Sequence, residues 1–210
     1  MPEQFDEAFW DERYGSREAL WSGKPNRHLV NETNDLAPGT ALDVGCGEGA
    51  DAIWLAECGW RVRAIDLSTV ALQRAAGNAD RVGAAVAERI TWDHVDLLEW
   101  DPGRGRYDLV SSQYTHLRSG ARRVVFDQLA AAVAPGGTLL IVGHHPSDLE
   151  TTMARPKEPD LFFTGDDIVA QLLSDEWDIV TNAAIAGTAT DPDGQTVTIH
   201  DTVLRAHRRR

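Results

Sequence analysis

The stretch LDVGCGEGADAIWLAECGW, at residues 42–60, constrains the fold more than any other part of the chain. An apolar run leads into Gly45, Gly47 and Gly49, and the residues that follow have the composition of a helix. Glycine lacks a Cβ atom, so the backbone can turn sharply and a ligand can approach to contact distance. In open α/β sheets, ligands bind outside the carboxyl ends of the strands. The stretch therefore predicts a strand, a ligand-binding turn and a helix, and the alternative is a tight turn that holds nothing.

The rest of the chain alternates short apolar runs with longer stretches rich in Ala and Leu. This alternation is typical of an α/β fold, in which helices cover both faces of a mostly parallel sheet. A length of 210 residues suits one domain. We expect strands over 40–45, 61–66, 89–94, 107–113, 137–143, 177–185 and 196–205, and helices over 50–58, 68–86, 118–134 and 164–173.

Local signals refine the ends of these elements. Ser68 and Thr164 are predicted N-caps, and Asp167 would complete a capping box with Thr164. The turn sequence DPDG at 191–194 leaves no room for a helix, so the last two strands should form an antiparallel hairpin at a sheet edge. Residues 3–30 form an aromatic-rich segment that we expect to be helical and to cover the carboxyl edge of the sheet.

Two acidic residues indicate which ligand the glycine turn would bind. Asp66 ends the next expected strand about 20 residues on, where a carboxylate can accept both hydroxyls of a ribose; the alternative is a helix N-cap. A dinucleotide fingerprint would read G-x-G-x-x-G, but here the third glycine comes one residue early. Asp43, two positions before Gly45, disfavours a nearby pyrophosphate and suits a cationic ammonium or sulfonium group. These features favour S-adenosylmethionine.

The ordered motifs resemble those of the Rossmann-like (class I) S-adenosylmethionine-dependent methyltransferases. ALDVGCGEGADAIWLAECGWRVRAIDLS resembles their first two motifs, HVDLLEW at 94–100 the third, and YDLVSSQYTHL at 107–117 the fourth, while APGGTLLIVGH at 134–144 resembles the turn and fifth strand that follow. The resemblance implies a seven-stranded sheet with an antiparallel last strand. It also implies that Asp96 accepts from the adenine amino group and that the Leu97 amide donates. The full set of cofactor-binding residues expected is Trp21, Asp43, Gly45, Cys46, Gly47, Asp66, Leu67, Asp96, Leu97 and Gln113.

The N-terminal sequence FWDERYGSREALWSGKPNRHL is similar to the aromatic lid of small-molecule methyltransferases, especially the tellurite-resistance and thiopurine enzymes. We expect one methyltransferase domain over 1–210, with a lid segment at 1–35, a cofactor-binding core at 36–145, and a substrate-side loop and C-terminal hairpin at 146–210. Trp10 and Tyr14 would stack on a flat or apolar acceptor or, alternatively, simply pack in the core.

Methyl transfer depends mainly on holding the acceptor in line with the methyl group, and such positioning contributes ~7–11 kcal/mol. Where the acceptor must lose a proton, His144 and His116 are the candidate bases, because both follow strands at the cofactor edge. Histidines at such places often only shape a pocket. Tyr114 and His145 are further candidates for substrate binding. No spacing of ligands indicates a metal site.

The charge and composition of the chain argue against several classes of binding partner. A net charge of −13 and a pI near 4.8 work against binding nucleic acid. The Asn/Asp-Pro-Pro-Tyr/Phe sequence of enzymes that methylate base or glutamine amines is absent from residues 111–114. Two cysteines, no signal sequence and no long apolar run predict a cytoplasmic protein without a membrane partner, either monomer or homodimer. A nicotinamide-dependent oxidoreductase and a non-catalytic S-adenosylmethionine-binding module remain alternatives.

Overall fold

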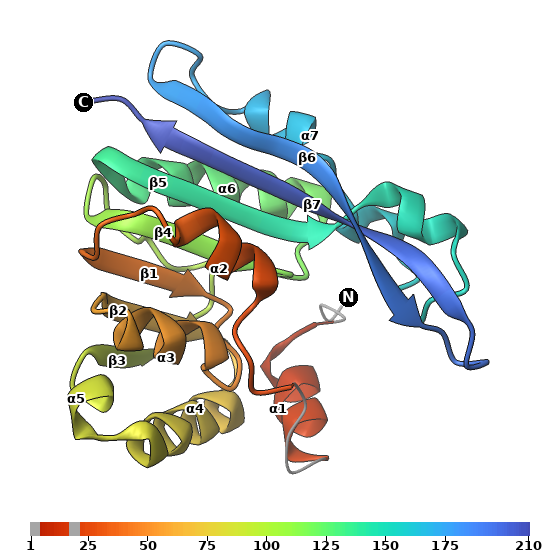
Figure 1. Ribbon diagram of the computed structural model, residues 1–210, viewed down its shortest axis with the longest axis horizontal. Coiled ribbons are helices and arrows are strands. Elements are labelled where there is room, and N and C mark those ends of the chain that lie inside the picture. Colours follow the sequence, from red (N-terminus) through yellow and green to blue (C-terminus); the bar gives the residue numbers. More distant parts are fainter. Residues whose placement is uncertain (1–4, 17–21) are drawn as a thin grey trace.

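The computed structural model describes residues 5–16 and 22–210, which form a seven-stranded sheet between helices (Figure 1). The strands are β1 (Thr40–Val44), β2 (Arg61–Asp66), β3 (Ile90–His94), β4 (Tyr107–Gln113), β5 (Val133–His144), β6 (Trp177–Thr190) and β7 (Thr196–Arg208). Their order is β3-β2-β1-β4-β5-β7-β6. The first five strands pair in parallel, and β7 runs antiparallel to both β5 and β6. This confirms the predicted α/β fold, with its antiparallel last strand and edge hairpin.

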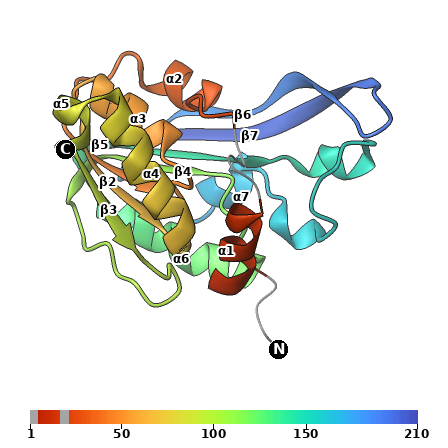
Figure 2. The same cartoon turned by 90° about the horizontal axis from the view of Figure 1, so that it is seen from below.

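Helices lie on both sides of the sheet. They are α1 (Glu7–Gly15), α2 (Arg27–Thr33), α3 (Ala50–Glu57), α4 (Thr69–Val82), α5 (Ala84–Ala87), α6 (Ser119–Ala132) and α7 (Gly165–Val169), with short 3-10 helices η1 (Pro146–Glu150) and η2 (Pro159–Leu161). Helices α2 and α3 lie on one side, and α6 and α7 lie on the other (Figures 1 and 2). The central strands are therefore buried on both faces, and Leu42, Leu109 and Leu140 have no exposed surface.

The order of the sheet reverses at β1 and β4. Helix α3 follows β1 and leads to β2 on one side, whereas β4 lies on the other side of β1. Ligands bind at such a switch point in open α/β sheets. Helix α1 lies beyond the carboxyl ends of the strands, close to this point (Figures 1 and 2).

Among the expected helical segments, three differ most from the structure. The helix expected over 68–86 breaks at Gly83, whose φ of 140° is open to glycine but strained for other residues, so α4 and α5 are separate. The helix expected over 164–173 ends at Val169, because the amides of Gln171 and Leu172 bond three residues back and close tight turns. The expected 3–30 helical segment contains α1 and only the first residues of α2.

The local capping predictions are confirmed. The Ser68 hydroxyl accepts a hydrogen bond from the Ala71 amide at 3.1 Å. Thr164 and Asp167 form the capping box at the start of α7. In the described part of the chain no helix combines the length and the apolar character needed to cross a membrane.

Candidate cofactor and acceptor site

The glycine turn after β1 has the backbone conformation that the sequence predicts. Gly45 has a φ of 70° and Gly47 a φ of 53°, both in the left-handed region. The amides of Gly45 and Cys46 donate to the Ile65 carbonyl at 2.9 and 3.0 Å, which ties the turn to the neighbouring strand β2. The turn is thus held open toward the carboxyl edge of the sheet.

The third glycine has a packing role. Gly49 has a φ of 85°, and a Cβ atom there would lie 2.7 Å from the Trp92 ring and 2.9 Å from the Ala75 side chain. Both neighbours belong to the next layer of the fold, on β3 and α4. Gly49 therefore allows α3 to start close against these elements, rather than making room for a ligand.

Two carboxyl groups lie close beneath the turn. Asp43 is 1% exposed, and its Oδ2 has no hydrogen-bond partner among the described residues. Burial and the charges of Asp51 and Asp66 raise the pKa of Asp43 well above its usual value. Asp51, in the first turn of α3, accepts from the Asn26 amide at 2.6 Å, and burial raises its pKa to about 6. Such a site gains from a cationic group, which would offset the buried negative charge.

Asp66 is held at the end of β2 by backbone donors. Its Oδ2 accepts from the Gly47 amide at 2.8 Å, and its Oδ1 accepts from the Ser68 amide at 2.8 Å. Burial raises the pKa of this carboxyl group. Each oxygen keeps a second lone pair for a ligand hydroxyl. The side chain that caps the first turn of α4 is Ser68.

A cavity of about 1130 Å³ opens at this edge of the sheet. It is large enough for a nucleoside ligand together with a second small molecule. The predicted site residues that line it are Trp10, Tyr14, Gly45, Cys46, Gly47, Asp66, Leu67, Asp96, Leu97, Gln113, Tyr114, His116 and His144.

Two predicted site residues that the structure describes do not line the cavity. Asp43 lies beneath the turn and acts on the cavity through its charge. His145 is not brought to the cavity: its Nδ1 accepts from the Ser147 amide at 3.2 Å and caps η1. Trp21 lies outside the described residues.

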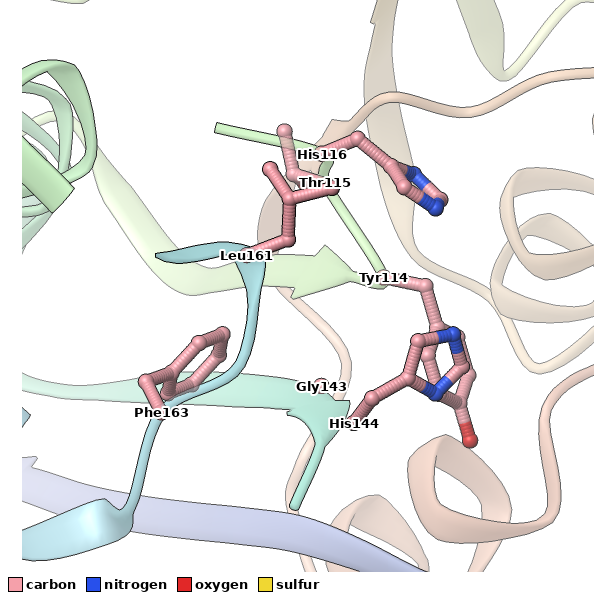
Figure 3. Close-up of a pocket in the computed structure, with 7 residues that line it drawn as sticks. All are labelled: Tyr114, Thr115, His116, Gly143, His144, Leu161 and Phe163. Atoms are coloured by element: carbon pink, nitrogen blue, oxygen red, sulfur yellow. The ribbon is translucent and has the colours of Figure 1, made fainter. Parts of the chain in front are cut away.

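Aromatic rings form one wall of the cavity beyond the glycine turn. Tyr114 has a positive φ of 51°, an unusual conformation for a non-glycine residue, and its ring lies 4.8 Å from that of His144. Trp10 of α1 lies 5.5 Å from His116. Figure 3 shows the Tyr114 and His144 rings side by side, with His116 projecting nearby and Phe163 on the other side of β5. The lid helix and the ends of β4 and β5 thus form one continuous ring surface.

Burial favours the neutral form of both cavity histidines. Burial, the Arg155 charge and His116 lower the pKa of His144 to about 3. The Nδ1 atom of His144 is buried, and no described residue bonds to it. Burial and the Arg13 charge lower the pKa of His116. The two rings can therefore offer hydrogen bonds, but they hold an added proton only weakly.

The structure adds residues that sequence reasoning missed. Asp51 carried a signal, since an acid in the first turn of the helix after a glycine loop lies beside the ligand. Arg155 lines the cavity and Asp11 holds the lid helix in place, and no local sequence pattern marks either residue. Asp11 of α1 accepts from the Ser68 hydroxyl at 2.5 Å and from the Val70 amide at 3.3 Å, which fastens the lid helix to α4.

Comparisons with known proteins agree with this geometry. Residues 41–137 match the methyltransferase domain family. A 2-heptyl-1-hydroxyquinolin-4(1H)-one methyltransferase of Mycobacteroides abscessus is 29% identical over 161 residues, which cover 70% of each chain. A "Probable tocopherol O-methyltransferase, chloroplastic" of Oryza sativa subsp. japonica is 30% identical over 133 residues, or 63% of this chain. The chain spans only 36% of the length of that rice relative.

A solved structure extends the fold likeness to nearly the whole chain. The TehB protein of Haemophilus influenzae superposes with a TM-score of 0.70 at 18% identity, covering 97% of this chain and 67% of that one. The glycine turn, the acids on β1 and β2 and the antiparallel last strand are those expected from the sequence motifs. Residues 41–137, a little under half of the chain, thus match the methyltransferase domain family, and the whole chain has the Rossmann-like fold of the class I S-adenosylmethionine-dependent methyltransferases.

Proposed function

We propose that this protein transfers a methyl group from S-adenosylmethionine to an oxygen, sulfur, nitrogen or chalcogen atom of a small molecule. The observation that carries the proposal is a pair of acids at the glycine turn: Asp43, which is buried and has an Oδ2 without a partner among the described residues, and Asp51, which is half-buried and lines one end of a cavity that also holds an aromatic wall. The first feature favours a cationic donor, and the second favours a flat acceptor beside it.

Different residues of this chain would bind different parts of the donor. Asp66 would accept the ribose hydroxyls, and Asp96 and Leu97 would bind the adenine. Asp43 and Asp51 would offset the positive charge of the methionine part. The bound donor supplies an electrophilic methyl group on a sulfonium centre. The acceptor lone pair forms the new bond to the methyl carbon while the carbon–sulfur bond breaks, and the sulfonium charge is lost.

The acceptor would lie against the aromatic wall. Trp10 and Tyr114 would stack on it and exclude water from the reacting atoms. His144 and His116 touch the same space. Because the pKa of His144 is about 3, removal of a proton from an ordinary alcohol by this ring would cost many kcal/mol, at ~1.4 kcal/mol per pKa unit. We infer that these histidines orient the acceptor, and that acceptors arrive ionised or lose their proton to solvent.

Turnover of an acceptor panel tests the proposal. The protein would be incubated with S-adenosylmethionine and phenols, thiols, hydroxyquinolones, quinols or tellurite, and S-adenosylhomocysteine would be measured by mass spectrometry. We expect acceptor-dependent formation of S-adenosylhomocysteine with acidic acceptors such as thiols and hydroxyquinolones. Binding of the donor without methylation of any acceptor would instead indicate a sensor.

A further inference from the structure

The charges that line the cavity are separated between its two halves. Asp51, Asp66 and Asp96 line the half formed around β1, β2 and β3. Four cationic side chains line the other half, from the lid and from the segments after β4 and β5. They are Arg13, Arg118, Arg155 and Lys157, accompanied by one acid, Glu158.

The positive charge of this half of the cavity contrasts with the negative net charge of the whole chain. The chain has 33 acidic and 20 basic residues, so an average surface would be acidic. Figure 2 shows strands β2 and β3 and the segment after β5 on opposite sides of α1, which accounts for the separation in space. The two further cations at the cavity, Lys24 and Arg27, precede or begin α2, and Arg27 is paired with the buried Asp201 at 3.2 Å.

Arg155 is the cation that the fold holds most firmly. Its Nε and Nη2 donate to Asp148 Oδ2 at 3.1 and 2.9 Å. Asp148 is fully buried, and its other oxygen accepts from the His200 amide of β7 at 2.7 Å. The guanidinium is itself largely buried, at 15% side-chain exposure. The third guanidinium nitrogen, Nη1, is not used in the pairing with Asp148, and Arg155 lines the cavity.

Arg155 also faces the place where the acceptor would lie. Its positive charge lowers the pKa of both His144 and Tyr114, although burial is the larger effect on His144 and raises the pKa of Tyr114. These are the two rings that lie side by side at the ends of β4 and β5 (Figure 3). A fixed guanidinium at the edge of a ring surface binds a flat molecule that carries an anionic oxygen group.

We propose that Arg155, positioned by Asp148, is a specificity-determining residue that binds an acidic group on a planar aromatic acceptor. This inference deepens the proposed function and rests on it. The acidic half of the cavity would hold the cationic donor, and the basic half an anionic acceptor. Opposite charges then bring the two reactants together, and Asp148 acts only through Arg155.

Binding of a matched pair of ligands tests the inference without relying on turnover. The probes are 1-hydroxy-2-naphthoate and its uncharged amide, 1-hydroxy-2-naphthamide, titrated by calorimetry into protein saturated with S-adenosylhomocysteine. We expect the acid to bind ~10-fold or more tightly than the amide, since hydrogen bonds to a charged group are worth ~1.5–3 kcal/mol. Equal binding, preference for the amide, or failure of both to bind the loaded protein would overturn the inference.

Variants test whether Arg155 causes the preference for the acid over the amide. R155Q should lose most of the preference for the acid, whereas R155K should retain part of it. R209Q is the matched control, because Arg209 pairs with Asp178 at the far side of β6 and should leave the preference unchanged. D148N should weaken binding of the acid more than that of the amide, and a loss of structure in D148N would lower both alike. An R155Q variant that keeps the full preference contradicts the assignment.

The same titrations separate this inference from the proposed function. Affinity for S-adenosylhomocysteine should be unchanged in R155Q. If the protein binds S-adenosylhomocysteine and methylates uncharged acceptors as well as anionic ones, the proposed function stands and the acidic-acceptor inference fails. If S-adenosylhomocysteine does not bind at all, the proposed function itself fails.

Discussion

At the scale of single residues, the donor side of the cavity shows a conflict between stability and binding. Asp43 is buried with an Oδ2 that has no donor among the described residues, Asp51 is half-buried nearby, and both have a raised pKa. A buried carboxylate of this kind destabilises the folded protein unless a cation or a proton joins it. We therefore expect these acids to lower the stability of the free protein and to raise its affinity for a cationic donor.

The conservative change Asp51→Asn tests this conflict. The folded-state pKa of about 6 lies above the usual aspartate value of 3.8, so the folded protein binds the proton more tightly and stability falls as pH rises from about 4 to about 6. Above that range the Asp51 carboxylate is charged and its full destabilising effect on the folded protein remains. The variant should therefore be more stable than the natural protein by about 3 kcal/mol at pH 8, at ~1.4 kcal/mol per pKa unit, and nearly equal in stability at pH 4. Urea unfolding at both pH values measures this, and an equal difference at the two would contradict it.

Asp66→Ala tests the ribose assignment. Loss of the charge-assisted hydrogen bonds should weaken binding of S-adenosylhomocysteine by ~1.5–3 kcal/mol in calorimetry. Asp80→Ala on the exposed surface of α4 is the control and should leave the affinity unchanged. An unchanged affinity in Asp66→Ala would remove this residue from the site.

At the scale of elements, the lid depends on a few hydrogen bonds. Helix α1 buries one of its residues, Tyr14, and Asp11 joins it to the first turn of α4. Such a small attachment suits a segment that must release product and admit the next ligand. We infer that α1 opens and closes as a unit.

Asp11→Ala should therefore loosen α1 selectively. Hydrogen exchange over residues 7–15 should become faster, while the sheet strands keep their protection, because the bonds to Ser68 and Val70 are lost. Glu12→Ala changes the next, exposed residue of the same helix and should have no such effect. Slow exchange of α1 in the Asp11 variant would show that other contacts hold the lid.

Sequence patterns predicted the ends of strands correctly where the strand lies inside the parallel sheet, between two neighbouring strands. The strands at 61–66 and 107–113 have the predicted ends, because apolar runs inside a parallel sheet are bounded by polar turns. The predicted strand at 177–185 was too short, since β6 continues to Thr190 and pairs with β7 beyond the end of β5 as a projecting ribbon (Figure 1). Such a ribbon needs no apolar face, so the pattern did not signal it.

The candidate site was predictable where it follows strand ends. Asp66, Asp96, Tyr114 and His144 all come directly after or at the end of parallel strands, which meet at one edge of the sheet. The position of Arg155 depends on how the loop after β5 folds against β7, and no local pattern encodes that contact. The same dependence on tertiary packing explains why the role of Asp11 was missed.

At the scale of the whole molecule, the cavity joins segments that lie far apart in the sequence, from Phe5 to Glu158. Lid residues, the glycine turn, the ends of β2 to β5 and the loop before α7 all line it. A ligand that contacts them together binds the folded state alone and stabilises it by mass action.

We expect a concentration-dependent rise in melting temperature with S-adenosylhomocysteine. At a concentration 100-fold above Kd the stabilisation would be ~2.7 kcal/mol. For a chain of this size, such a gain corresponds to a shift of roughly 5–10 °C. NAD at the same concentration should give no shift, because the glycine turn lacks the spacing that a pyrophosphate needs. A shift with NAD alone would favour an oxidoreductase.

The most direct measurement is a crystal structure of the protein with S-adenosylhomocysteine. The account predicts the ribose hydroxyls on Asp66, the adenine beside Asp96, and the amino group of the homocysteine part near Asp43 and Asp51. The sulfur should face the ring surface of Tyr114 and His144. Electron density for the ligand outside this cavity, or a ribose that makes no contact with Asp66, would contradict the account.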